Sequence, residues 1–193
     1  MNHELLQELD LLLNDFKAYP LSTSDIFEIL DGKCNIVIYK DVHTYKSIDD
    51  LLGDHDCAVI LYESKPFYGH WCCLFKQDDT LSFFDPLGGN IDDQLEFIDH
   101  NFAKESHQDF PYLTDLILGC PYDDLEYNQY HFQKDREDVS TCGRWCCLRL
   151  LLRDLSLEDF KDLLLSRSGD DVATILTSDV FDDQVVSKEA LAL

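Results

Sequence analysis

A short, unbroken run of apolar residues constrains the fold of this chain most. Residues Cys57–Tyr62 read Cys-Ala-Val-Ile-Leu-Tyr, with no charged side chain among them. A short continuous run of this kind is typical of a β-strand in a sheet that is covered on both faces. A chain of 193 residues is long enough to bury such a core within one domain.

Further strands and helices are predicted around this run. Two aromatic-rich segments, Gly69–Phe75 and Thr80–Asp85, flank a polar turn and indicate a β-hairpin. We therefore expect an α+β fold with a central mixed sheet of about five strands flanked by helices. The other strands are predicted at Cys34–Lys40 and Glu126–Phe132; helices are predicted over 4–17, 25–30, 47–52, 92–105, 143–153, 157–166 and 171–180, and Tyr112–Leu118 fits either type.

We expect a single domain over residues 1–181, with the helix of residues 1–17 docked on it and an acidic tail over 182–193. No apolar run approaches the roughly 20 residues that span a bilayer, and the N-terminus lacks the pattern of a signal peptide. The eight cysteines lie mostly in apolar runs, which favours a reducing compartment over a disulfide scaffold. These features predict a monomer that is neither secreted nor inserted in a membrane.

The formal net charge of −24 argues against a nucleic-acid-binding face, because such faces need clusters of Lys and Arg. Acidic pairs such as Asp78-Asp79 and Asp182-Asp183 lie in expected turns or near the chain end. A solvated surface is the simpler interpretation of these pairs. A basic partner is the alternative.

Residues Ser140–Cys147 precede the apolar stretch Leu148–Leu152 and indicate a loop that enters a buried helix. Ser140 and Thr141 are expected to cap this helix through their side-chain oxygens. Cys142 would then lie at the first turn, where the helix dipole favours a thiolate, the nucleophilic form of cysteine. The alternative is that Cys142 is simply a small buried side chain.

His70 is the one histidine of seven that lies inside a strongly apolar strand. If the hairpin turns midway between Gln77 and Asp78, His70 lies directly opposite Asp85, with their Cβ atoms about 4.5–5.5 Å apart. A buried carboxylate in that position would fix the tautomer of a catalytic imidazole. A slip of one residue would separate the two side chains, and His70 would then be an ordinary core residue.

Gln133 lies in the polar loop before Cys142 and is a candidate oxyanion donor, together with the backbone N–H of Cys142. Gln129 is the rival candidate. The alternative for Gln133 is a solvated loop residue.

With these residues in view, the chain resembles the adenovirus-type cysteine proteases (adenain), and most closely the versions in large DNA viruses, Polinton-like elements and virophages of the mavirus type. The order His, Asp, Gln, Cys along the chain is that of the family and of the SUMO-specific proteases. The resemblance spans residues 20–180. Its motifs are Gly69-His70-Trp71, Phe84-Asp85-Pro86-Leu87-Gly88, Tyr127-Asn128 with Gln133, and Thr141-Cys142-Gly143-Arg144-Trp145-Cys146.

The resemblance implies that Cys142 is the nucleophile, with His70 as the base and later the acid. It implies that Asp85 orients His70, and that Gln133 stabilises the oxyanion. Trp71 would restrict the cleft to substrates with a small residue, typically glycine, before the scissile bond. The implied substrates are capsid precursor proteins, cleaved during virion maturation in the viral factory of the host cytoplasm and in the virion.

The chain also departs from the adenovirus pattern. The loop between Gln133 and Cys142 is longer, and the negative charge argues against the DNA cofactor of the adenovirus enzyme, so we expect no cofactor. An activating peptide is left open, since Cys120 lies in a broadly similar place to the cysteine that links that peptide.

Two alternative functions are compatible with these residues. An isopeptidase acting on ubiquitin-like conjugates would need the same catalytic groups. A non-enzymatic zinc or interaction protein could use Cys72-Cys73, Cys146-Cys147 and His70, but the chain has no Cys-x2-Cys pair and adjacent cysteines are poor zinc ligands. We therefore expect no metal site.

Overall fold

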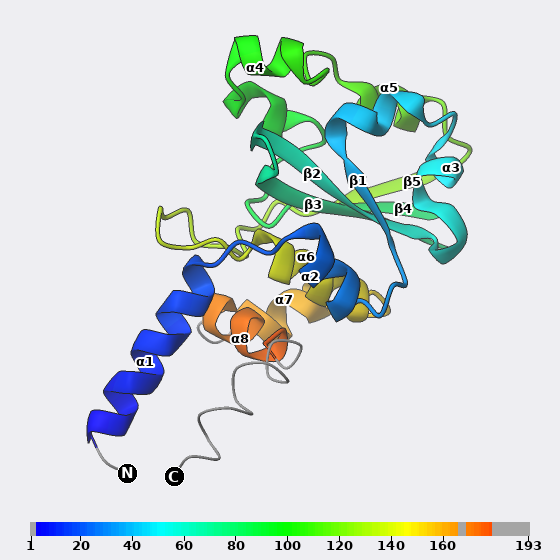
Figure 1. Ribbon diagram of the computed structural model, residues 1–193. Helices are drawn as coiled ribbons and strands as arrows, with labels where there is room; N and C mark the ends of the chain where they lie inside the picture. Colours follow the sequence, from blue (N-terminus) through cyan, green and yellow to red (C-terminus); the bar gives the residue numbers. More distant parts are fainter. Residues whose placement is uncertain (1–2, 166–168, 179–193) are drawn as a thin grey trace.

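The computed structural model describes residues 3–165 and 169–178, and it contains one five-stranded sheet whose strands lie side by side in chain order (Figure 1). The three central strands are antiparallel, whereas each outer strand runs parallel to its neighbour. The expected α+β class with a mixed sheet is therefore confirmed. The strands are β1 (Asn35–Ile38), β2 (Cys57–Lys65), β3 (Tyr68–Gln77), β4 (Thr80–Phe84) and β5 (Asp124–Tyr127).

Helices cover both faces of the sheet. Figure 1 shows α2, α6, α7 and α8 on one face, α3, α4 and α5 on the other, and α1 extending away from the sheet. None of the helices seen in residues 3–165 and 169–178 has both the length and the apolarity needed to cross a bilayer. The helices are α1 (His3–Ala18), α2 (Thr23–Ile29), α3 (Ile48–Leu52), α4 (His100–Glu105), α5 (Tyr112–Leu118), α6 (Cys142–Leu151), α7 (Leu157–Leu165) and α8 (Gly169–Leu176).

The alternation of side chains along the strands divides the interior into two cores. Trp71, Cys73 and Phe75 of β3 face α6, while Cys72 and Leu74 face the opposite layer. Every residue of the apolar run in β2 is buried, as expected for a strand covered on both faces. The site residues on β3 are consequently held between two packed layers.

Several predicted elements have other bounds. The helix predicted over 92–105 is wrong, because it is divided into a 3₁₀ turn at Asp93–Phe97 and α4. Asp99 separates the two: its carboxylate accepts hydrogen bonds from the backbone of Asn101 and Phe102 and begins a new helix there.

The strand predicted at Glu126–Phe132 lies earlier, at β5, and the ambiguous segment 112–118 is α5. The strand predicted from Cys34 to Lys40 ends at Ile38, where a 3₁₀ turn begins. The tail over 182–193 and the last residues of the helix predicted over 171–180 lie outside the described residues.

The β3–β4 hairpin turns one residue later than predicted, between Asp78 and Asp79. Gln77 therefore pairs with Thr80, and Cys73 pairs with Phe84. Asp78 adopts a positive φ of 50°, which Asp tolerates better than most residues. The predicted register is wrong by two residues, but a two-residue shift leaves every side chain on its original face.

Candidate active site

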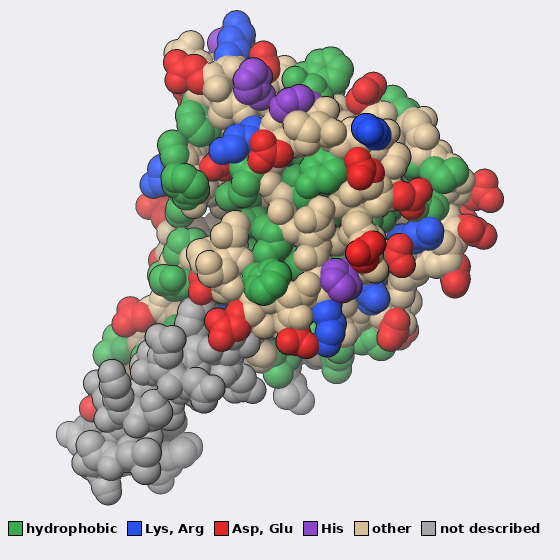
Figure 2. Space-filling view, turned by 45° about the vertical axis from the view of Figure 1, so that its right-hand side comes forward, with side chains coloured by type: hydrophobic (Ala, Val, Ile, Leu, Met, Phe, Trp, Pro, Cys, Tyr) green, Lys and Arg blue, Asp and Glu red, His purple; other side chains and the backbone are tan. Residues whose placement is uncertain are grey.

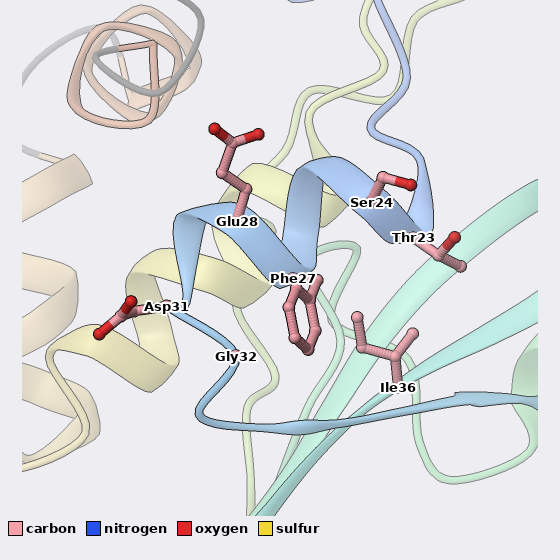
Figure 3. Close-up of a pocket in the computed structure, with 7 residues that line it drawn as sticks. All are labelled: Thr23, Ser24, Phe27, Glu28, Asp31, Gly32 and Ile36. Atoms are coloured by element: carbon pink, nitrogen blue, oxygen red, sulfur yellow. The ribbon is translucent and has the colours of Figure 1, made fainter.

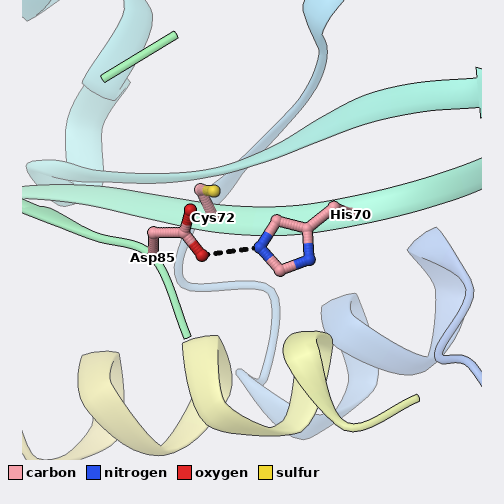
Figure 4. A group of neighbouring side chains, drawn as sticks. All are labelled: His70, Cys72 and Asp85. Atoms are coloured by element: carbon pink, nitrogen blue, oxygen red, sulfur yellow. Dashed lines mark hydrogen bonds and ion pairs between the residues drawn. The ribbon is translucent and has the colours of Figure 1, made fainter. Parts of the chain in front are cut away.

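His70 lies on the part of β3 that extends beyond the end of β4. The ladder ends at the pair Cys73 and Phe84. Its continuation places Asp85 opposite Cys72. His70 lies two residues before Cys72 on β3, so its side chain is on the same face as those of Cys72 and Asp85. The His70 imidazole bridges this diagonal, and its Nε2 lies 2.7 Å from Oδ1 of Asp85 (Figure 4). The structure thus brings the two residues together through a diagonal contact and not through the direct pairing that we expected.

The Asp85 carboxylate is fully buried and held from several sides. Its Oδ1 accepts a hydrogen bond from the backbone N–H of Leu87, and its Oδ2 accepts one from Nε2 of Gln94, both at 2.8 Å. The Asn128 side chain bonds both backbone groups of Asp85. Burial alone would raise the pKa of Asp85, but His70 and these donors lower it below its ordinary value.

Cys142 is the first residue of α6, and its thiol interacts with the side chain of His70. Burial alone would raise the pKa of Cys142, but the hydrogen bond and charge of His70 lower it, helped by the backbone N–H groups of Trp71 and Gly143. Burial would likewise lower the pKa of His70, but Cys72, Asp85 and Cys142 raise it well above its ordinary value. The electrostatics therefore favour a thiolate beside an imidazolium.

The N-terminus of α6 is not capped as predicted. Thr141 is the N-cap residue, but its hydroxyl makes no cap hydrogen bond and donates to Oδ1 of Asp170 on α8, at 2.6 Å. The indole N–H of Trp145 donates to the same oxygen at 3.0 Å, and the backbone N–H of Lys134 donates to Oδ2 at 3.1 Å. Asp170 therefore ties the nucleophile helix and the loop before it to α8.

Gln133 is buried in the loop before α6 and is not a solvated residue. The backbone N–H groups of Phe132 and Gln133 both donate to the carbonyl of Pro86, next to Asp85. Nε2 of Gln133 donates to the Val139 carbonyl at 3.3 Å, and Oε1 has no hydrogen-bond partner within the described part of the chain. The second N–H of the amide is left for another acceptor, and the oxyanion role stays a prediction.

Trp71 is buried against the start of α6. Its indole N–H donates to the Leu21 carbonyl at 3.0 Å, and a Cβ on Gly143 would lie 3.2 Å from its ring. The close packing explains why the residue after Cys142 is a glycine. The substrate-restricting role of Trp71 stays a prediction.

Sequence reasoning missed the roles of four residues of this site: Gln94, Asn128, Asp170, and Cys72, which it considered only as part of a zinc-binding alternative. Strand alternation could have identified Cys72, because it lies two residues from His70 on the same face. Gln94 follows a turn whose path no local pattern fixes, and Asp170 reaches the site from a distant helix. Asn128 entered only as part of a family motif, without a role of its own.

A cavity of about 680 Å³ lies apart from these residues, between α2 and β1 (Figure 3). The side chains of Phe27, Glu28 and Ile36 line it with those of Thr23, Ser24 and Asp31. It contains neither a cysteine nor a histidine.

No protein-family model matches the chain. Solved structures with similar folds include the ASFV protease, at 9% identity and a TM-score of 0.42, covering 75% of this chain. ChlaDub1 of Chlamydia trachomatis is 19% identical, with a TM-score of 0.40, and the match covers 95% of this chain and 78% of ChlaDub1. The SUMO protease Ulp1 is 16% identical, with a TM-score of 0.36, and the match covers 88% of this chain and 83% of Ulp1. The match spans only 57% of the ASFV protease.

A sequence relative occurs in Sputnik virophage. Its protein V9, itself uncharacterized, is 45% identical to this chain over 150 residues, which are 77% of this chain and 85% of V9. The match confirms the virophage part of the resemblance. The chain belongs to the same protein family as V9 of Sputnik virophage.

Proposed function

We propose that this protein is a viral cysteine endopeptidase that cleaves capsid precursor proteins during virion maturation. The observation that carries the proposal is the series Asp85–His70–Cys142, in which Asp85 is hydrogen-bonded to His70 and His70 interacts with the thiol on the first residue of α6. A nucleophile, a base and an orienting carboxylate in contact are what acyl transfer by a thiol requires. Cleavage of the capsid precursors would take place in the viral factory of the host cytoplasm and in the virion.

The reaction begins when the Cys142 thiolate attacks the carbonyl carbon of the scissile peptide. The oxyanion that forms is stabilised by the Cys142 backbone N–H and by the free N–H of the Gln133 amide. His70 then gives its proton to the leaving amine, the C–N bond breaks and a thioester remains. His70, held by Asp85, next takes a proton from water, which attacks the thioester and releases the acid and the thiol.

Two features support the substrate side of the proposal. The relative in Sputnik virophage fits a role in the virus life cycle. The tight contact of Trp71 with Gly143 leaves little room beside the nucleophile, which agrees with a small residue, such as glycine, before the scissile bond.

The test is to co-express the capsid precursor with the wild-type protein, with Cys142→Ala and with Cys147→Ala under reducing conditions. Cys147 is a matched control, because it is also a buried thiol of α6 but is not in contact with His70. Wild type and Cys147→Ala should cleave, and mass spectrometry of the products would identify the residue before the cut. Cleavage by Cys142→Ala, or by no variant, would contradict the proposal.

A panel of ubiquitin- and SUMO-linked reporters distinguishes the proposed endopeptidase from an isopeptidase. Cleavage of these reporters in a Cys142-dependent manner, with the capsid precursor left intact, would show an isopeptidase with the same catalytic residues.

A further inference from the structure

Cys72 adds a third metal-binding group to the His70–Asp85 pair. One ligand atom from each of His70, Cys72 and Asp85 lies within 4.8 Å of the other two (Figure 4). We propose that these three residues form a Zn²⁺ site on the side of the imidazole away from Cys142, and that bound zinc switches off catalysis. Binding stands on the geometry alone, whereas inhibition rests on the proposed function.

The three groups have the chemistry that zinc selects. Thiolate sulfur, imidazole nitrogen and carboxylate oxygen bind Zn²⁺ at about 2.0–2.3 Å in tetrahedral sites, so their mutual separations are about 3.3–3.8 Å. The present spacing, from 2.7 Å between His70 and Asp85 to at most 4.8 Å, requires only small side-chain movements. Three protein ligands with a fourth position for water is a common zinc arrangement.

The sequence suggested zinc at Cys72 and His70, but the absence of a Cys-x2-Cys pair argued against it, and Asp85 was not expected as a ligand. His70 and Cys72 are separated by one residue on a strand, so both side chains lie on one face. Asp85 is then supplied by the neighbouring strand end. Each ligand is at least largely buried, which keeps the cluster rigid.

The cluster has a supporting residue and an acidic cavity next to it. Gln94 donates to Oδ2 of Asp85, while Oδ1 faces the imidazole and accepts from the backbone N–H of Leu87. Gln94 and Gly89 also line a cavity of about 340 Å³, to which Asp93 and Glu96 contribute carboxylates and no described residue contributes a Lys or Arg. A Cβ on Gly89 would lie 2.6 Å from Oδ2 of Asp85, so the residues that line the cavity are in contact with the buried ligand.

Zinc would replace two protons. One leaves Nε2 of the His70 imidazolium and the other leaves the Cys72 thiol, while the proton on Nδ1 stays beside Cys142. The metal-bound imidazole cannot accept a second proton, so it cannot cycle between base and acid. Asp85 would at the same time bind the metal and would no longer orient His70 through a hydrogen bond.

Cobalt(II), a spectroscopic substitute for zinc, tests binding without reference to activity. Titrated into purified Cys142→Ala, it should give a thiolate-to-cobalt charge-transfer absorption, which one equivalent of zinc abolishes. Cys142→Ala with Cys72→Ala should lose this absorption. Cys142→Ala with Cys73→Ala is the matched control, since Cys73 is the adjacent buried thiol on the opposite face, and it should keep the absorption.

The supporting residue gives a second, graded readout. Gln94→Leu should weaken zinc binding by about 10- to 100-fold, as loss of outer-shell partners typically does. Circular dichroism and melting temperature would verify that each variant is folded.

Inhibition is measured separately, relative to each variant's own activity. Zinc should inhibit the wild type reversibly, with recovery on adding EDTA, and should inhibit Cys72→Ala much less. Binding that persists in Cys72→Ala, or that is lost in Cys142→Ala alone, would place the metal on Cys142 and overturn the proposal. Absence of any binding to Cys142→Ala would overturn it as well, whatever the protease assay shows.

Discussion

Cys142 differs from the other described cysteines of the chain in its neighbours more than in its burial. It contacts an imidazole and lies at the N-terminal end of a helix, whereas burial raises the pKa of Cys146 and Cys147 on the same helix well above the ordinary value. One turn of helix therefore separates a thiol that favours ionisation from thiols that resist it.

Iodoacetamide at neutral pH should alkylate Cys142 at least about tenfold faster than the other seven cysteines, since each unit of pKa changes the thiolate fraction about tenfold. Because the pKa of Cys142 is lowered whereas burial raises those of Cys146 and Cys147, its rate should fall at a lower pH than theirs. Peptide mass spectrometry after timed labelling would measure the rates. His70→Ala should raise the pKa and slow the reaction at neutral pH.

Cys120 provides the internal comparison in that experiment, because it is more exposed than the other seven. Labelling of Cys120 at the rate of Cys142 would show that access, and not ionisation, sets the reactivity.

At the residue scale, the sequence predicted the contact between His70 and Asp85 through an incorrect register. The prediction survived because the strand period is two residues and the hairpin error was two residues. The contacts of Asn128 and Gln94 with Asp85 could not be predicted, since each depends on where a loop returns to the sheet and not on a local pattern.

At the scale of elements, α6 is anchored through Asp170. This carboxylate is 2% exposed and accepts three hydrogen bonds, from Thr141, Trp145 and the backbone of Lys134. The predicted capping by Ser140 and Thr141 would have made α6 locally self-sufficient. Its start depends instead on a neighbouring helix.

Asp170→Ala should destabilise the protein by about 2–4 kcal/mol, because it leaves buried donors without an acceptor. The same change should slow the alkylation of Cys142. Asp171→Ala is the control: this neighbour on α8 pairs with Lys17 and its side chain is 29% exposed, so its loss should cost less than that of Asp170, which is 2% exposed. Urea unfolding would measure both, and equal losses would argue against the anchoring role.

The spacing of apolar residues predicted most of the helices and strands but not the residues at which they begin and end. The positions of the central strands followed from their apolar and aromatic content, whereas the break at Asp99 within the segment 92–105 did not, since the apolar spacing continues across it. Only the side chain of Asp99, which caps α4, divides the segment.

At the scale of the whole molecule, negative charge dominates. Figure 2 shows acidic side chains spread over the visible face, with Lys and Arg between them in smaller number, as the excess of 39 acidic over 15 basic residues requires. Mutual repulsion of this kind opposes the compact state.

Raising NaCl from about 10 mM to about 100 mM should therefore increase the melting temperature, because the screening length falls from about 30 Å to about 10 Å. Each kcal/mol of repulsion removed corresponds to about 2–4 °C. Calorimetry in KCl and LiCl at equal ionic strength should give the same increase. A shift with one cation alone would indicate specific binding in place of screening.

Because Asp170 anchors α6, the order of synthesis determines when the nucleophile helix gains its support. Translation delivers the thiol, the imidazole and the carboxylate of the site before it delivers α8, and chains fold from the N-terminus as they emerge. A growing chain thus carries every reactive group while the helix that presents the nucleophile still lacks its support. We therefore expect the low-pKa state of Cys142, which depends on the position of α6, to form only after synthesis has passed α8.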